Sequence, residues 1–154
     1  SDLSKWDVSS LVEVSSMFWD ASAFNSDLSK WDVSNVIDME FMFTKASAFN
    51  NDISEWDVSS VTDMTAMFAA ATNFNGDISK WDVSRVTDME DMFARAASFT
   101  QMLCGAWATS SADKDGMFAA SSGGLCMIST TSTTTCTTTT TSSKYYLKIN
   151  LIIA

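Results

Sequence analysis

The sequence of 154 residues contains no histidine and no proline, and only five glycines and three cysteines. Without histidine the chain lacks the side chain that most often serves as a general base or metal ligand near neutral pH. It also lacks a glycine-rich phosphate loop, and its serines have no neighbouring base that would activate them as nucleophiles. We therefore expect a protein that is not an enzyme and that carries no cofactor.

Basic residues are also scarce. The 9 Lys and Arg against 19 Asp and Glu give a net charge of −10. Nucleic acids are bound through clusters of Lys and Arg, so we expect no nucleic-acid partner. No run of 18 or more apolar residues occurs, and we expect a protein that does not span a membrane. The acidic surface is compatible with cationic partners, with divalent cations, or simply with solubility.

What the chain does contain is a repeat of 25 residues. Two aromatic positions recur in register: Trp6, Trp31, Trp56 and Trp81, and Phe24, Phe49, Phe74 and Phe99. A fixed period of this size indicates stacked supersecondary units, because one unit cannot bury its own apolar side. We predict a repeat solenoid, in which residues 25 apart are stacked neighbours.

The third unit predicts what each turn contains. Ile53 and Val61–Met64 are expected in two short β-strands, with Ile53 pointing inward. Met67, Phe68 and Ala71 have the i, i+1, i+4 spacing of one helical face, which predicts a brief helical or 3₁₀ segment. The fold class expected is thus a repeat solenoid with short β-strands and one brief helical or 3₁₀ segment per 25-residue turn.

Four parts are expected along the chain. Residues 1–98 hold four regular turns, and residues 99–128 form a degenerate C-terminal cap. Residues 129–143 are a Thr/Ser-rich linker, and residues 144–154 are an apolar terminal segment. Ser1-Asp2-Leu3 aligns with Gly76-Asp77-Ile78, so we expect the chain to start inside a unit and to derive from a longer precursor.

The unit F-N-x-D-I-S-x-W-D-V-S-x-V-T-D-M-x-x-M-F, clearest at residues 77–84 and 86–89, resembles the mycoplasma-lipoprotein-type surface repeat. That repeat is similar to BspA-type leucine-rich repeats. The resemblance covers residues 1 to about 100. The resemblance implies a right-handed, leucine-rich-repeat-like solenoid, often found on secreted or surface-anchored proteins that bind other proteins. It implies no catalytic residues.

Cys104 and Cys126 lie 22 residues apart, nearly one full turn. Stacked neighbours are separated by about 4.7–4.9 Å, and a disulfide needs Cα atoms about 4.4–6.8 Å apart. We predict a disulfide that closes the cap, and with it an extracellular, cell-surface or other oxidising location. Two small buried thiols are the alternative. Cys136 is then left over, either free or paired between molecules.

Aspartates also form columns, one of which contains Asp27, Asp52 and Asp77. Like charges one coil apart repel. Each carboxylate either accepts hydrogen bonds from backbone amides of its own turn, is screened by a neighbouring lysine, or shares a Ca²⁺ ion with the next turn. We favour the amide bonds and keep Asp27, Asp52 and Asp77 as weak metal candidates.

The regular tryptophans are expected in the core, each with its N–H bonded to a turn carbonyl or a serine. An exposed aromatic strip is the alternative. Trp19 stands outside the column and is a candidate contact residue. The terminal segment either covers an edge of the stack as a strand or docks a partner. Its candidate contact residues are Tyr145, Tyr146, Leu147 and Ile149.

These observations predict a non-enzymatic scaffold for protein–protein contacts, exposed at a surface or incorporated in a larger assembly. The second hypothesis is a structural building block, whose copies stack end to end or join through the C-terminal tail into a homo- or hetero-assembly. The third is a calcium- or carbohydrate-binding module.

Overall fold

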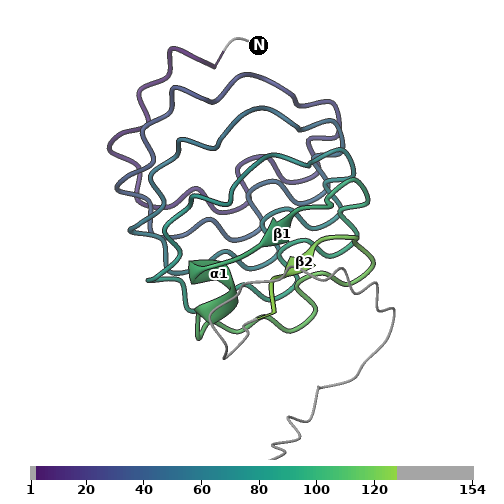
Figure 1. The fold of residues 1–154 in the computed structure, drawn as a ribbon. Helices are drawn as coiled ribbons and strands as arrows, with labels where there is room; N and C mark the ends of the chain where they lie inside the picture. The colour runs from purple at the N-terminus through teal and green to yellow at the C-terminus, as the bar shows by residue number, and fades with distance from the viewer. Residues whose placement is uncertain (1–2, 128–154) are drawn as a thin grey trace, which may run out of the picture.

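The structure is a computed structural model that describes residues 3–127. The chain winds in successive coils that lie one upon the next from the N-terminal to the C-terminal end (Figure 1). Coils one to five comprise residues 3–23, 24–48, 49–73, 74–98 and 99–123, and residues 124–127 begin a sixth. The expected linker at 129–143, the terminal segment at 144–154 and residue 128 of the expected cap lie outside the described residues.

Regular secondary structure is confined to the C-terminal end of the described chain. Strand β1 (Met102–Leu103) pairs in parallel with β2 (Gly124–Leu125), and Met102 is opposite Gly124. Helix α1 spans Ala106–Thr109. Elsewhere among residues 3–127, the β-type pairing consists of isolated parallel bridges along one column of acidic residues: Glu13, Asp38, Asp63, Asp88 and Asp113.

A ladder of backbone hydrogen bonds joins each coil to the next. In coil three the N–H groups of Met64, Ala66, Phe68 and Ala70 donate to carbonyls of coil four at 2.7–3.0 Å. The N–H groups between them close β-turns inside the coil, as Met67 does to the Met64 carbonyl at 3.2 Å. Donors thus alternate between the neighbouring coil and the same coil, and the pattern recurs in coils one, two and four.

The expected helical segment and short strands of each regular turn are not found in residues 3–98. A helix would direct every N–H back to its own segment, and none would remain for the next coil. The turns instead place two residues per coil at positive φ, such as Ala66 (49°) and Ala70 (55°). Ile53 is buried as predicted, and Val61 and Met64 are buried too, although none of the three lies in a strand; Asp63, between Val61 and Met64, forms isolated bridges to the neighbouring coils.

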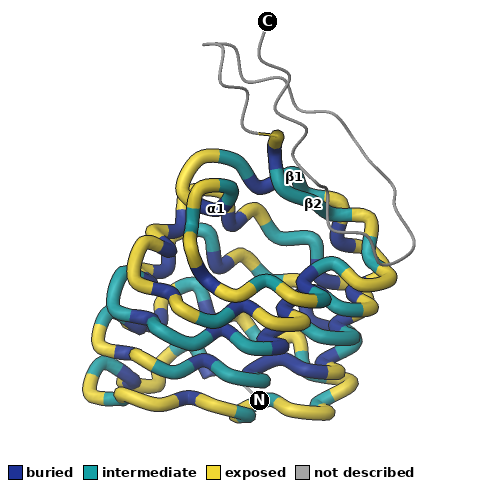
Figure 2. Tube along the Cα trace, turned by 90° about the horizontal axis from the view of Figure 1, so that it is seen from below, coloured by how far each residue is buried: buried dark blue, intermediate teal, exposed yellow. Residues whose placement is uncertain are grey.

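The core consists of aromatic and aliphatic columns that run along the stack. The rings of Phe43, Phe68 and Phe93 follow one another at 5.5 and 5.7 Å. A second phenylalanine column, which includes Phe49, Phe74 and Phe99, runs beside the first. Its rings lie closer to the first column than successive rings of that column lie to each other, as Phe74 lies 3.9 Å from Phe68. Exposed stretches of chain recur at the outer bends of successive coils, while buried stretches face inward (Figure 2).

The tryptophans extend the core and tie neighbouring coils together. The indoles of Trp56 and Trp81 stack with their centroids 6.4 Å apart and an interplanar angle of 5°. Each indole N–H donates to a carbonyl of the preceding coil; Trp56 donates to Leu28 at 3.0 Å and Trp81 to Ile53 at 3.1 Å. The prediction that the regular tryptophans are buried and bonded to carbonyls is confirmed for Trp31, Trp56 and Trp81, which belong to coils two to four. Trp6 has no coil in front of it among the described residues and is 59% exposed.

Coil five differs from the others in ways that suit a terminal position. Helix α1 absorbs one extra residue, and Trp107 still reaches the column, donating to the Ile78 carbonyl at 3.2 Å. Lys114 replaces the methionine of the earlier coils. Its ammonium donates to the carbonyls of Ser110 at 2.5 Å and Ala112 at 3.3 Å, and burial lowers the pKa of Lys114. The Ala112 carbonyl lies where earlier coils bond to the next coil, so Lys114 satisfies it instead.

No helix within residues 3–127 is long and apolar enough to cross a membrane.

Candidate functional site

The aspartate columns are used to form the bends of each coil. The Ser54 N–H donates to Asp52 Oδ1 at 2.9 Å, and the Ser79 N–H donates to Asp77 Oδ1 at 3.0 Å. Asp27 accepts the same bond from the Ser29 N–H at 2.9 Å. Such local bonds between a short polar side chain and the amide two residues on define an Asx turn. The predicted amide bonding of these carboxylates is confirmed.

These bonds also stabilise the ionised carboxylates. In each case the hydroxyl and the N–H of the serine two residues on lower the pKa of the aspartate from the ordinary 3.8. This holds for Asp7, Asp32, Asp77 and Asp82. For Asp52 the Ser54 N–H is the larger cause of a pKa that is likewise lowered. A hydrogen bond to the charged form favours that form, whereas neighbouring aspartates oppose it.

Glu40 shows the opposite behaviour. Burial, followed by the charges of Asp63, Asp38 and Asp88, raises the pKa of Glu40 from the ordinary 4.5. The repulsion expected along the acidic columns is therefore present, and here no local hydrogen bond offsets it among the described contacts.

A shallow groove of about 360 Å³ lies where coils three and four meet. It contains two of the predicted metal candidates, Asp52 and Asp77, together with Lys80, whose Nζ lies 3.6 Å from Glu55 Oε1. Polar side chains and one glycine line it: Asn50, Asn51, Asp52, Ser54, Asn75, Gly76, Asp77 and Lys80.

The asparagines of this groove bond to one another along the stack. The Asn50 N–H donates to Asn25 Oδ1 at 3.0 Å, and the Asn75 N–H donates to Asn50 Oδ1 at 2.8 Å. Thr100 continues the series, donating to Asn75 Oδ1 at 3.0 Å. The amide oxygens therefore align the bends of successive coils, as the carboxylates do within each bend.

The metal candidates consequently have structural partners already. Within residues 3–127, no group of three or more Cys, Asp or Glu side chains is arranged to hold a metal ion. Asp27, Asp52 and Asp77 each fix one bend, and Ca²⁺ would have to compete with those amide bonds for the same oxygens. We assign no ligand to the groove.

Exposed apolar side chains gather at the N-terminal end of the molecule. The predicted contact residue Trp19 is 52% exposed, and its ring stacks on Phe41 of coil two at 5.7 Å. Four other large apolar residues of the first two coils are also exposed: Trp6, Val12, Met17 and Ile37. Tyr145, Tyr146, Leu147 and Ile149 fall outside the described residues.

The stacking of Trp19 on Phe41 was not predicted from the sequence. Phe41 stands where later coils have Ala66, Asp91 and Gly116. Ile37 stands where they have Thr62, Thr87 and Ala112. A large apolar residue at a column position that is otherwise small or polar was the signal available. It identifies the residues of coils one and two that depart from the repeat.

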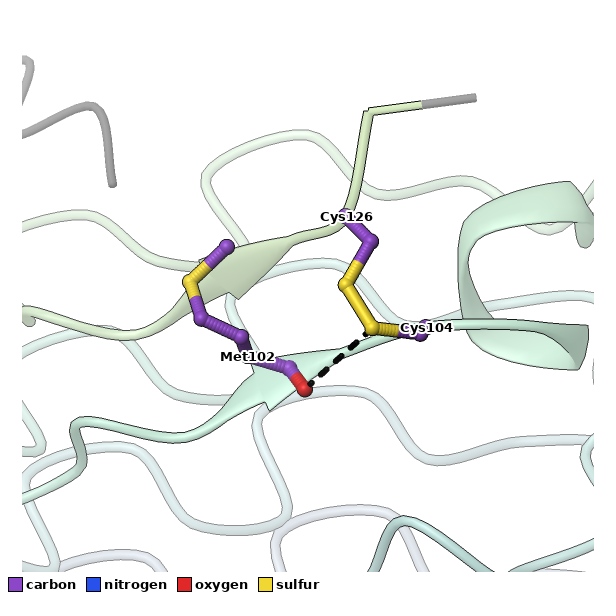
Figure 3. The surroundings of a disulfide bond; sticks show 3 residues. All are labelled: Met102, Cys104 and Cys126. Atoms are coloured by element: carbon purple, nitrogen blue, oxygen red, sulfur yellow. Dashed lines mark hydrogen bonds between the residues drawn. A yellow bond between two sulfur atoms is a disulfide. The ribbon is translucent and has the colours of Figure 1, made fainter. Parts of the chain in front are cut away.

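The predicted partners Cys104 and Cys126 are joined by a disulfide, with their Cα atoms 4.8 Å apart. The bond links the chain after β1 to the chain after β2, and the Cys104 Sγ lies 3.8 Å from the Met102 carbonyl oxygen (Figure 3). It therefore fastens the start of the sixth coil onto the fifth.

Comparison with known proteins gives one family. Residues 1–70, and again residues 28–123, match the family described as Mycoplasma protein of unknown function, DUF285. No curated protein and no solved structure matches the chain.

Proposed function

The chain belongs to the DUF285 family of Mycoplasma proteins of unknown function, and from this premise we propose that it is a non-enzymatic scaffold for binding other proteins. We also propose that its coils are those of a BspA-like, leucine-rich-repeat-like solenoid. The ladder of hydrogen bonds between coils and the continuous aromatic columns support this description.

The observation that carries the proposal is the exposed indole of Trp19. Tryptophan is enriched among the few residues that supply most of the binding energy at protein interfaces. A tryptophan that is half exposed yet held against a second ring presents a large apolar surface that is already ordered.

The backbone around Trp19 is fixed on both sides. The Trp19 N–H closes a turn to the Ser16 carbonyl at 3.0 Å, and the next N–H, of Asp20, donates to Thr44 of coil two at 2.8 Å. Little conformational freedom is therefore lost when a partner covers the ring. The exposed carboxylate of Asp20 adds a negative rim, which favours a partner with an apolar side chain beside a cationic one.

An extracellular or cell-surface location is part of the same proposal. The Cys104–Cys126 disulfide supports it, because such bonds persist mainly in oxidising compartments.

The test selects peptides from a random library displayed on phage, with the whole chain immobilised, and measures the Kd of each enriched peptide by calorimetry. Trp19→Ala should weaken binding by about 30-fold or more, which corresponds to the 2 kcal/mol that defines a hot spot.

Trp6→Ala is the matched control, because it removes another exposed tryptophan from the same coil and should change the Kd by less than about twofold. Peptides that bind equally well to the wild type and to Trp19→Ala would refute the role given to this side chain. Failure to enrich any peptide would count against the scaffold function itself.

A further inference from the structure

The asparagines that align successive coils are followed by different residues. They occupy one column of the stack: Asn25, Asn50 and Asn75. The residues after them are, in the same order, Ser26, Asn51 and Gly76. Asn75 is the one asparagine of the sequence that precedes a glycine. In such a pair the backbone nitrogen can approach the side-chain amide closely, because glycine has no Cβ that crowds the approach.

The two nitrogen atoms of this pair are free of hydrogen bonds. Neither the Gly76 N–H nor the Asn75 Nδ2 group donates a hydrogen bond within residues 3–127. The equivalent place in coil three is different, because there the Asn51 side chain donates to Asn25 Oδ1 at 2.8 Å. The Gly76 nitrogen is thus available as a nucleophile, and the Asn75 Nδ2 group is available as a leaving group.

The amide oxygen of Asn75, by contrast, is surrounded by donors from coil five. The Thr100 N–H donates to it at 3.0 Å, the Thr100 hydroxyl at 3.4 Å and the Gln101 Nε2 group at 3.3 Å. Negative charge develops on a carbonyl oxygen when a nucleophile adds to its carbon, and donors that are already in place stabilise that charge. The bonds that align coil five therefore also activate the Asn75 side chain toward attack.

The polar groove between coils three and four exposes this pair to solvent. Asn75 and Gly76 both line the groove, whose volume is about 360 Å³, and both residues are partly exposed. A solvent base can therefore reach the Gly76 N–H, and water can reach the Asn75 side chain.

We propose that Asn75 undergoes spontaneous deamidation in the folded protein. The Gly76 nitrogen loses its proton to a solvent base and forms a bond to Cγ of Asn75. The bond from Cγ to Nδ2 breaks, and Nδ2 takes up a proton from solvent and leaves as ammonia. The product is a cyclic imide in which the Gly76 nitrogen is bonded both to Cγ and to the main-chain carbonyl carbon of residue 75.

Water opens this ring in two ways. Addition of water at Cγ breaks the new bond and leaves aspartate at position 75. Addition at the main-chain carbonyl carbon breaks the original peptide bond and leaves isoaspartate, in which the main chain runs through Cγ. Water and a solvent base are the only co-reactants, and nothing is oxidised or reduced.

The two products affect the stack differently. Aspartate retains an oxygen for the Thr100 N–H, and its charge strengthens that bond. Isoaspartate lengthens the main chain of coil four at this bend and displaces the oxygen that Thr100 contacts. Both products add a negative charge to the groove that contains Asp52 and Asp77, and isoaspartate also weakens the attachment of coil five.

The test incubates the full chain at neutral and at alkaline pH, under conditions in which circular dichroism shows that it is folded. Mass spectrometry of a digest then follows the peptide that contains Asn75. We expect the mass increase that accompanies replacement of –NH₂ by –OH at Asn75, and a faster reaction at alkaline pH because the Gly76 nitrogen must lose its proton. Chromatography should separate an aspartate and an isoaspartate peptide, while Asn25 and Asn50 should remain largely unchanged.

Gly76→Gln is the matched control, because Gln101 occupies the same position in coil five. Its Cβ would lie 3.1 Å from the Phe74 ring, which requires only a small shift. This variant should slow deamidation of Asn75 about tenfold or more, since a side chain now crowds the nitrogen. Gln101→Leu removes one donor from the Asn75 oxygen and should also slow the reaction. Thermal melts verify that both variants are folded.

Three outcomes would overturn the proposal. An Asn75 that stays intact in the folded chain, while the chain unfolded in urea reacts there, would show that the fold holds the amide away from the Gly76 nitrogen. Equal rates in the wild type and Gly76→Gln would show that this nitrogen is not the nucleophile. A faster reaction in Gln101→Leu would show that the bonds to the amide oxygen protect it instead of activating it.

Discussion

At the scale of single residues, the turns depend on a backbone conformation that L-amino acids adopt reluctantly. Among residues 3–127, nine residues other than glycine have positive φ, and in coils one to four they occur in pairs four residues apart. The left-handed region costs such residues roughly 1–2 kcal/mol each. The ladder between coils maintains it, because residues such as Ala70 donate their N–H to the next coil.

Two adjacent alanines test this strain. Ala70 has φ 55°, whereas Ala69 is not at positive φ, and both are partly buried. Ala70→Gly should increase the free energy of unfolding by up to about 1 kcal/mol, because glycine removes the strain. Ala69→Gly should decrease it by about 0.5–1 kcal/mol, because only the added freedom of the unfolded chain remains. Urea titrations measure both, and equal losses in the two variants would contradict the strain.

The tryptophan column provides a second residue-scale prediction. Trp81 is 3% exposed and Trp6 is 59% exposed, although they occupy the same position of the repeat. Trp81→Ala should cost about 3–5 kcal/mol, since it removes a buried ring between two others. Trp6→Ala should cost less than about 1 kcal/mol, as exposed substitutions do. Thermal melts measure both variants, and similar losses of stability would contradict the difference in burial between Trp81 and Trp6.

At the scale of the bends, the aspartates confer a pH dependence of known sign. Asp7, Asp32, Asp52, Asp77 and Asp82 have lowered pKa values in the folded chain, so folding favours their ionised form. Their stabilisation is fully present above the ordinary 3.8 and is lost as the pH falls through the lowered values. Glu40, whose pKa is raised, contributes with the opposite sign.

Urea titrations between pH 7 and pH 2 should therefore show stability decreasing below about pH 4. Asp82→Asn retains an oxygen for the Ser84 N–H but cannot titrate, so this variant should lose part of that decrease. A variant with an unchanged pH profile would show that Asp82 does not contribute through its ionisation.

The bends and the turns differ in how well the sequence predicts them. Asp52 and Ser54 lie two residues apart, so their hydrogen bond could be predicted from local chemistry alone. The conformation of the segment around Met67, Phe68 and Ala71 could not be predicted in this way, because the spacing of its apolar residues fits both a helix and a series of β-turns. The choice between them depends on the donors needed by coil four, which lie 25 residues away in sequence.

The candidate site shows the same division. Contacts between residues one repeat apart, such as Trp56 with Trp81, follow from the period and are present in the structure. The contact of Trp19 with Phe41 joins two residues that each depart from the repeat, and no periodic argument places them together. Predicting it required the path of the turns, which was predicted wrongly as helical.

At the scale of the whole molecule, protection of the backbone should vary along the stack. Phe68 and Phe118 occupy the same position of the repeat, but only the Phe68 N–H has a partner among residues 3–127. Hydrogen exchange at Phe68 should be at least about a hundredfold slower than at Phe118 in dilute solution. Equal exchange rates at Phe68 and Phe118 would contradict this difference in backbone pairing.

The closure of each bend by its own Asp–Ser pair has one more consequence. The Asp–Ser bends within residues 3–127 each take their carboxylate from their own turn. Removal of residues 50–74 therefore joins Phe49 to Asn75 and restores the same sequence pattern across the junction. The molecule then becomes shorter by one step of about 4.8 Å. The length of the stack therefore changes only in steps of one repeat. Duplication or loss of a repeat in the gene can set the distance between the two ends without changing the sequence of either end.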